Sequence, residues 1–350
     1  MHHNNNIAAE KRLYMTATPR IYGNHAKAKA LQEGIELCSM DNEALYGTSL
    51  HIINFSEAVE LGLLTDYKVV VLTIDEDHVS SRLQNLLKDD SNQLRVDDAG
   101  RIIGCWKALC KQGITTSNLD DPDPMQKAVA FCQVIEPSKG RTHKVSSKQI
   151  SEMFQTVVEA YQEKGNDEDI NLNCEAQHVD GGMNASQKEE KIEWLKAPTD
   201  QNTCRILSNV RCLSEGVDVP ALDAILFMSP RNSQVEVVQS VGRVMRKAEG
   251  KKLGYVVLPV VIPHGMNAKE ALDDNKTYRV VWEVLQALRS HDDRFDAFVN
   301  KVDLMNDTSG KMEVISITDA LSPKTKAKSK RDTGKGRHSI GEPNLSLIHI

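Results

Sequence analysis

The second half of the sequence alternates short apolar runs with amphipathic helical patterns. The apolar runs, rich in Val, Ile and Leu, cover residues 127–135, 204–210, 224–229 and 253–262. Such runs are typical of strands that are buried on both faces of a parallel sheet. Between them, apolar residues recur every three or four positions, which predicts helices at 147–165, from 186 onward and at 234–247. Strands that alternate with helices predict an α/β fold with a parallel sheet and helices on both faces.

The flanking segments differ in composition from this alternating region. Residues 67–74 (YKVVVLTI) form another apolar run, and a polar stretch after it ends in Asp-Pro-Asp-Pro at 121–124. We therefore expect a helical insert and linker over 77–124. Residues 266–322 favour a helical accessory segment. Lys, Arg, Pro and Gly crowd residues 323–350, which predicts a basic disordered tail.

Composition limits the kinds of partner and compartment. The 350 residues are enough for about two domains. They carry 43 Lys and Arg against 49 Asp and Glu, a net charge of −6, so nucleic-acid contacts would have to be local. Seven cysteines without a CxxC pair predict reduced thiols in a cytoplasmic protein, with no metal site. No apolar run reaches the roughly 18 residues of a membrane span, so we expect no membrane partner.

The strongest chemical signal is a set of four residues in the predicted helix at 234–247. Gln239, Gly242, Arg243 and Arg246 are spaced i, i+3, i+4 and i+7, which places them on one helical face. Arginine binds phosphate through a planar, permanently charged fork, and a glycine lets another backbone approach closely. This pattern is what an arginine finger on a transferring phosphoryl group requires. The alternative is an ordinary solvated basic face.

Two neighbouring segments strengthen the phosphate interpretation. Residues 208–220 (SNVRCLSEGVDVP) and 239–246 (QSVGRVMR) resemble motifs V and VI of superfamily-2 helicases, and residues 16–20 (TATPR) resemble motif III. In that family the nucleotide lies between two RecA-like motor domains. The resemblance therefore implies a RecA-like parallel sheet for this chain.

The resemblance extends over about residues 7–265. Residues 13–23 (LYMTATPRIYG) and 55–76 (FSEAVELGLLTDYKVVVLTIDE) are similar to large bacterial and phage helicases related to the motor subunits of type I and type III restriction enzymes. It implies that residues 1–76 are the end of a first motor domain. Residues 125–265 would be the complete helicase C-terminal domain.

The family assigns roles to individual positions of this sequence. Three side chains would take part in ATP hydrolysis, the arginines as fingers: Gln239, Arg243 and Arg246. Four residues would bind or sense the nucleotide in the interdomain cleft: Glu215, Gly216, Asp218 and Gly242. Six would contact nucleic acid or couple it to the nucleotide: Thr16, Thr18, Arg20, Gly181, Gly182 and Ser208.

Two elements needed to bind ATP and Mg²⁺ are absent from the sequence. There is no fitting GxxxxGK[ST] loop to hold the phosphates. Asp75-Glu76-Asp77-His78 mimics a DExH box, but it follows the Thr-Ala-Thr segment, whereas the family's box precedes it. We therefore expect a truncated first motor domain and a chain that is inactive alone. ATP and Mg²⁺ would bind only in the intact protein.

The sequence thus favours the C-terminal part of an ATP-dependent helicase or translocase. On the resemblance alone, its partners are double-stranded DNA, the missing N-terminal motor domain, and a nuclease or methyltransferase module. One alternative is a non-catalytic module that binds nucleic acid or a protein partner. Another is an unrelated α/β enzyme whose arginine pair binds a phosphorylated small molecule.

Overall fold

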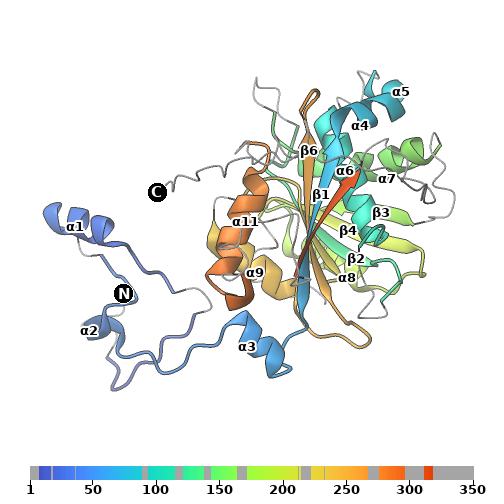
Figure 1. Cartoon of the computed structure of the whole chain (residues 1–350). Helices are drawn as coiled ribbons and strands as arrows, with labels where there is room; N and C mark the ends of the chain where they lie inside the picture. The colour runs from blue at the N-terminus through green and yellow to red at the C-terminus, as the bar shows by residue number, and fades with distance from the viewer. Residues whose placement is uncertain are drawn as a thin grey trace, which may run out of the picture. The chain divides into compact units, whose positions relative to one another are not determined.

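The chain folds around one seven-stranded parallel sheet (Figure 1). The computed structural model describes residues 8–16, 19–35, 37–88, 94–114, 121–137, 143–163, 172–211, 213, 222–231, 233–266, 276–295 and 311–317. The strand order is β3-β4-β2-β5-β6-β1-β7, and every pairing is parallel. The strands are β1 (Tyr67–Asp75), β2 (Lys127–Phe131), β3 (Asn173–His178), β4 (Thr203–Asn209), β5 (Ala224–Phe227), β6 (Gly254–Ile262) and β7 (Met312–Ile317). The predicted α/β class is confirmed.

Helices cover both faces of the sheet, as the alternating pattern predicts. One face packs against α4 (Glu76–Arg82), α6 (Val96–Leu109) and α7 (Ser147–Gln162). The other packs against α8 (Ala185–Lys196), α9 (Gln234–Val244) and α11 (Arg279–Arg289), of which α9 and α11 lie beside each other in Figure 1. The remaining described helices are α1 (Asn24–Gln32), α2 (Glu43–Tyr46), α3 (Phe55–Glu60) and α5 (Gln84–Leu87).

Strand β1 shows why these strands are continuously apolar. Val69 and Val71 belong to the core under α9 and α11, whereas Val70 and Leu72 belong to the core under α6 and α7. All four side chains are at most 1% exposed. Because successive side chains point to opposite faces, a strand covered on both faces needs apolar residues at every position.

The position of β1 differs from the expected domain boundary at residue 76. Residues 67–75 are assigned above to the end of a first motor domain, but β1 pairs with β6 along its whole length, from Tyr67 opposite Gly254 onward. Helix α6 of the expected insert packs on the same sheet. At Gly104 an added Cβ would lie 2.6 Å from Cδ1 of Ile74, so the glycine permits close packing. The sequence of a strand that is buried on both faces does not indicate which sheet the strand joins.

Two strands and one cap also differ from expectation. The polar edge strand β3 and the second edge strand β7 are absent from the sequence prediction, and β7 lies inside the segment expected to be helical. Residues 8–16, which precede and enter the Thr-Ala-Thr segment, form no strand. The capping box of α8 joins Asn184 and Gln187, so the helix begins at Ala185, one residue before the predicted start at 186. The basic tail at 323–350 lies outside the described residues.

Candidate functional site

Helix α9 carries the predicted arginine face and is anchored at both ends. The Ser233 side chain caps its first turn by accepting the backbone N–H of Glu236 at 3.3 Å. Val237, Val241 and Val244 are fully buried against the sheet. The helix begins after the carboxyl end of β5 and ends beside the first residue of β6. Its remaining face is therefore held in a fixed orientation.

Three of the predicted residues, Gln239, Gly242 and Arg243, lie on α9, whereas Arg246 lies beyond the helix, which ends at Val244 and not at residue 247 as predicted. Arg243 is 9% exposed, and Gln239, Gly242 and Arg246 are partly buried. A Cβ added at Gly242 would meet no atom within 4 Å. Nothing in the described part of the chain therefore requires a glycine there. The glycine keeps open the space between the flanking polar side chains, where an outside group can approach.

A third arginine, missed by the sequence analysis, supports the start of α9. The Arg231 guanidinium lies 4.7 Å from the centroid of the Phe131 ring and donates to the Val210 carbonyl at 2.8 Å. It also lies 3.5 Å from the carboxylate of Glu236. Burial lowers the pKa of Arg231, which is only 8% exposed. Arg231 thus ties the ends of β2 and β4 to α9, although no local motif marks it.

The predicted glycine pair lies in the turn between β3 and α8. The Gly182 N–H donates to Asp180 at 2.7 Å, and the Lys188 ammonium donates to the Gly181 carbonyl at 3.1 Å. A Cβ at Gly181 would meet nothing within 4 Å. The reciprocal bonds between Asn184 and Gln187, of 2.9 and 3.0 Å, then begin α8. This turn leaves backbone groups accessible at the carboxyl end of β3.

Ser208 does not reach the surface but connects to this turn through a buried chain of hydrogen bonds. Its hydroxyl donates to the Ser147 carbonyl at 2.8 Å and accepts from the Ser147 hydroxyl at 3.0 Å. The Ser147 hydroxyl lies 2.7 Å from Nδ1 of His178, whose Nε2 lies 2.9 Å from Asp180. The bond from His178 lowers the pKa of Asp180. Both serines are fully buried, so this Ser-His-Asp array supports the Gly182 turn and offers no exposed nucleophile.

The other predicted residues are not brought to these two regions by any described contact. Thr16 and Arg20 are exposed in the segment before α1. Thr18, Glu215, Gly216 and Asp218 lie outside the described residues.

The residues that mimic a DExH box have local structural roles. Asp75 caps α4 by accepting the Asp77 N–H at 2.8 Å. Glu76 accepts the backbone N–H of His264 at 2.9 Å, and His78 lies 2.7 Å from the Tyr161 hydroxyl. These bonds fasten the carboxyl end of β1 to its neighbours.

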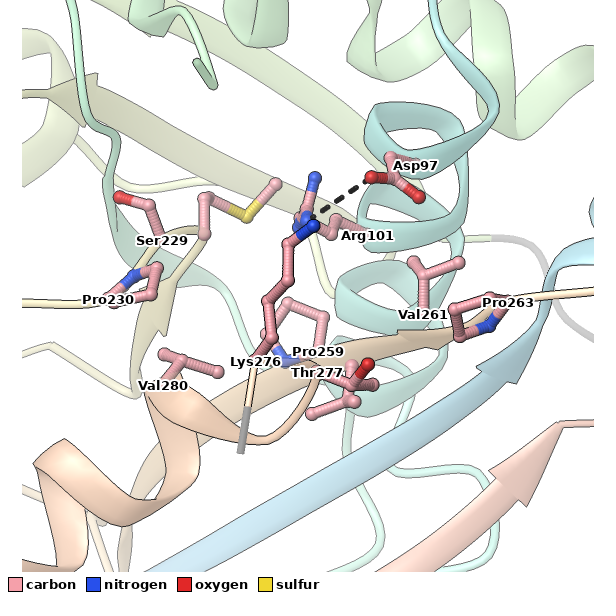
Figure 2. Close-up of a pocket in the computed structure, with 12 residues that line it drawn as sticks. Asp97, Arg101, Ser229, Pro230, Pro259, Val261, Pro263, Lys276, Thr277 and Val280 are labelled. Atoms are coloured by element: carbon pink, nitrogen blue, oxygen red, sulfur yellow. Dashed lines mark ion pairs between the residues drawn. The ribbon is translucent and has the colours of Figure 1, made fainter. Parts of the chain in front are cut away.

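A pocket of about 250 Å³ lies between α6, the segment before α11 and the carboxyl ends of β5 and β6 (Figure 2). Arg101 and Lys276 extend into it beside apolar walls that include Pro259. Arg101 is already paired with Asp98 at 3.1 Å and Asp97 at 3.8 Å. Most of its charge is therefore neutralised within the chain.

The parallel sheet with helices on both faces is the RecA-like fold of a helicase C-terminal domain, and comparisons with known proteins agree. Residues 126–248 match the helicase conserved C-terminal domain. The solved structure of the ATP-dependent Type ISP restriction-modification enzyme LlaBIII bound to DNA is 42% identical, with a TM-score of 0.74 over 92% of this chain. The protein named Probable helicase A859L, from African swine fever virus, is 33% identical over 90 residues, which is 26% of this chain.

The chain therefore carries a match to the helicase C-terminal domain over residues 126–248 and is similar to a restriction-modification enzyme. It spans only 20% of the restriction-modification enzyme and 10% of the viral protein. Among the helices that the structure describes, none combines the length and the apolar character needed to cross a membrane.

Proposed function

We propose that this chain is the C-terminal part of an ATP-dependent DNA helicase or translocase, in which Arg243 and Arg246 act as arginine fingers. The observation that carries the proposal is the carboxyl end of α9, where Gly242 borders open space beside Gln239 and Arg243, and Arg246 follows two residues after the helix. A fixed helix that holds permanently charged side chains beside open space suits a transferring phosphoryl group.

A second observation supports the proposal that another part of the polypeptide forms a first motor domain, which packs against this chain. Among described residues, the exposed large apolar side chains lie before β1, except for Ile135 and Val235. Met15, Leu31 and Leu50 are each at least 80% exposed. Soluble proteins rarely leave so many apolar side chains uncovered, and a partner surface is the common reason. The first motor domain would cover this segment and supply the loop and carboxylates for ATP and Mg²⁺.

The nucleic-acid partner is proposed from the Gly181–Gly182 turn and from the relatives. Gly181 and Gly182 are both exposed beside the N-terminus of α8, a position that suits phosphate contacts that do not depend on base sequence. The similar restriction-modification enzyme is described as ATP-dependent and bound to DNA. We infer that the protein moves along double-stranded DNA and that a nuclease or methyltransferase module is a further partner.

The test compares ATP hydrolysis by this chain alone and by a two-domain protein that adds the first motor domain. We expect no hydrolysis above background by the chain alone, and DNA-stimulated hydrolysis by the two-domain protein. Arg243→Ala should reduce the latter by about 10³-fold or more. Arg279→Ala is the matched control, because Arg279 is exposed on α11 and pairs with Glu283 at 2.7 Å.

The outcomes separate the candidate functions. Hydrolysis that survives Arg243→Ala would refute the arginine-finger assignment. DNA binding without any hydrolysis by the two-domain protein would favour the non-catalytic binding module instead. Binding of phosphorylated metabolites that is lost in Arg243→Ala, without any effect of DNA, would favour an unrelated α/β enzyme.

A further inference from the structure

The carboxyl end of α9 is held by one lysine side chain. The Lys251 ammonium donates hydrogen bonds to the carbonyls of Val244 and Arg246, the latter at 3.2 Å, and to the Leu222 carbonyl at 2.6 Å. The last carbonyls of a helix have no partner within the helix, and a cation there also interacts favourably with the helix dipole. Lys251 therefore fixes the same turn from which Arg243 and Arg246 project.

The segment between α3 and β1 holds the same turn from the other side. The Thr65 N–H donates to the Met245 carbonyl at 2.8 Å. The Gly254 N–H, at the start of β6, donates to the Asp66 carbonyl at 2.8 Å. A Cβ on Gly254 would lie only 2.5 Å from the Val244 carbonyl oxygen. The end of α9 is thus packed tightly against β6 and the chain that enters β1.

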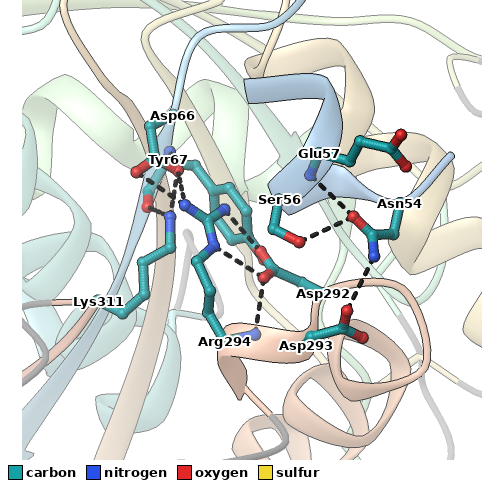
Figure 3. Close-up of polar contacts among 9 residues, drawn as sticks. All are labelled: Asn54, Ser56, Glu57, Asp66, Tyr67, Asp292, Asp293, Arg294 and Lys311. Atoms are coloured by element: carbon teal, nitrogen blue, oxygen red, sulfur yellow. Dashed lines mark hydrogen bonds and ion pairs between the residues drawn. The ribbon is translucent and has the colours of Figure 1, made fainter. Parts of the chain in front are cut away.

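Asp66 is in turn anchored by a polar cluster, formed by Asp66, Tyr67, Asp292, Arg294 and Lys311 (Figure 3). Its carboxylate accepts a hydrogen bond from Arg294 at 3.1 Å and pairs with Lys311. The fully buried Asp292 accepts from the Tyr67 hydroxyl at 3.0 Å and from Arg294 at 2.9 Å. The segment of Thr65 and Asp66, which contacts the end of α9 from one side, is therefore held in place by these charged partners. On the other side, the end of α9 is held by Lys251.

We propose that Lys251 is a positioning residue for ATP hydrolysis, which holds the arginine-bearing end of α9 in place through its ammonium group. The inference rests on the proposed function, because positioning matters only if the arginines act on the nucleotide. Within the described residues, the hydrogen bonds of the Lys251 ammonium go to backbone carbonyls, so its effect passes through the helix. A displacement of about 1 Å at a reacting group can cost on the order of a hundredfold in rate.

The charge of Lys251 makes this role sensitive to pH. Burial lowers the pKa of Lys251 to about 8, and the negative charge of Asp223 opposes part of that shift. The other charged groups nearest along the chain are the cations Lys252, Lys247 and Arg246 and the carboxylate of Glu249. Deprotonation removes one donor and the positive charge, so the hold on the last carbonyls of α9 weakens as pH rises through about 8.

The experiment measures kcat and KM for ATP from pH 6.5 to 9.5 in the two-domain protein. It compares the wild type with Lys251→Met, Lys251→Arg and Arg243→Ala. Lys196→Met is the matched control, because that lysine is partly exposed on α8 and pairs with Glu193 at 2.9 Å. Thermal melting at each pH shows whether every variant is folded. The wild-type pH profile needs no substitution and stays informative if one variant fails to fold.

We expect the wild-type kcat to fall above pH 8 while KM changes less than about twofold. Lys251→Met should lower kcat about ten- to a hundredfold at pH 7 and lose the fall above pH 8. Lys251→Arg, which stays protonated, should retain activity at pH 9. An unchanged kcat in Lys251→Met, together with a large loss in Arg243→Ala, would overturn this inference alone. Full activity in Arg243→Ala would overturn the proposed function and the inference with it.

Discussion

Replacement of Gly254 by alanine should destabilise the protein and shift the arginine helix. The new Cβ would lie 2.5 Å from the Val244 carbonyl oxygen and 3.1 Å from its carbonyl carbon, whereas ordinary contact begins near 3.4 Å. The backbone of β6 or of α9 must therefore move by about 0.9 Å. Overpacking of this kind costs about 1–3 kcal/mol of unfolding free energy. The same shift at the end of α9 should lower the kcat of the two-domain protein.

Gly242→Ala is a matched control, because Gly242 lies on α9, the helix that Gly254 of β6 approaches. No atom lies within 4 Å of the added Cβ, and alanine favours a helix over glycine by about 0.5–1 kcal/mol. The unfolding free energy, from urea titration at pH 7, should therefore fall for Gly254→Ala and rise for Gly242→Ala. If Gly254→Ala were as stable as the wild type, the close approach of β6 to α9 would not be rigid. That result would refute the reasoning.

Three further outcomes follow from hydrogen bonds in the structure. Burial alone would raise the pKa of Asp292, but its cationic partners hold the pKa below 3.8. The ionised carboxylate therefore stabilises the folded protein above that pH, and this stabilisation is lost as the pH falls through the folded-state pKa. Urea titrations from pH 2.5 to 7 should show this acid loss reduced in Asp292→Asn. Ser147→Ala removes the partner of Nδ1 of the partly buried His178 ring and should cost about 1–3 kcal/mol, measured by denaturation. Asn184→Ala should cost about 1 kcal/mol by removing the cap of α8, whereas Ser186→Ala should cost far less.

The sequence by itself determined the elements whose residues interact with near neighbours. The apolar runs at 127–135 and 253–262 locate β2 and β6, and the spacing of apolar residues locates α7 and α9. The i, i+3, i+4 spacing also places Gln239, Gly242 and Arg243 on one face of α9, since helical geometry depends on local sequence, whereas the end of the helix at Val244 leaves Arg246 outside it. These patterns were sufficient for the fold class and for the composition of the α9 face.

Only the tertiary structure decided which distant segments meet. Strand β1 joins the sheet between β6 and β7, and Ser147 reaches His178 and Ser208, because backbone pairing and side-chain contacts connect residues far apart in sequence. Lys251 lies in no motif, and its role becomes visible only when its ammonium meets three carbonyls at the end of α9. Periodicity encodes which face of a segment is buried, but the partner that buries it is set by packing of the whole chain.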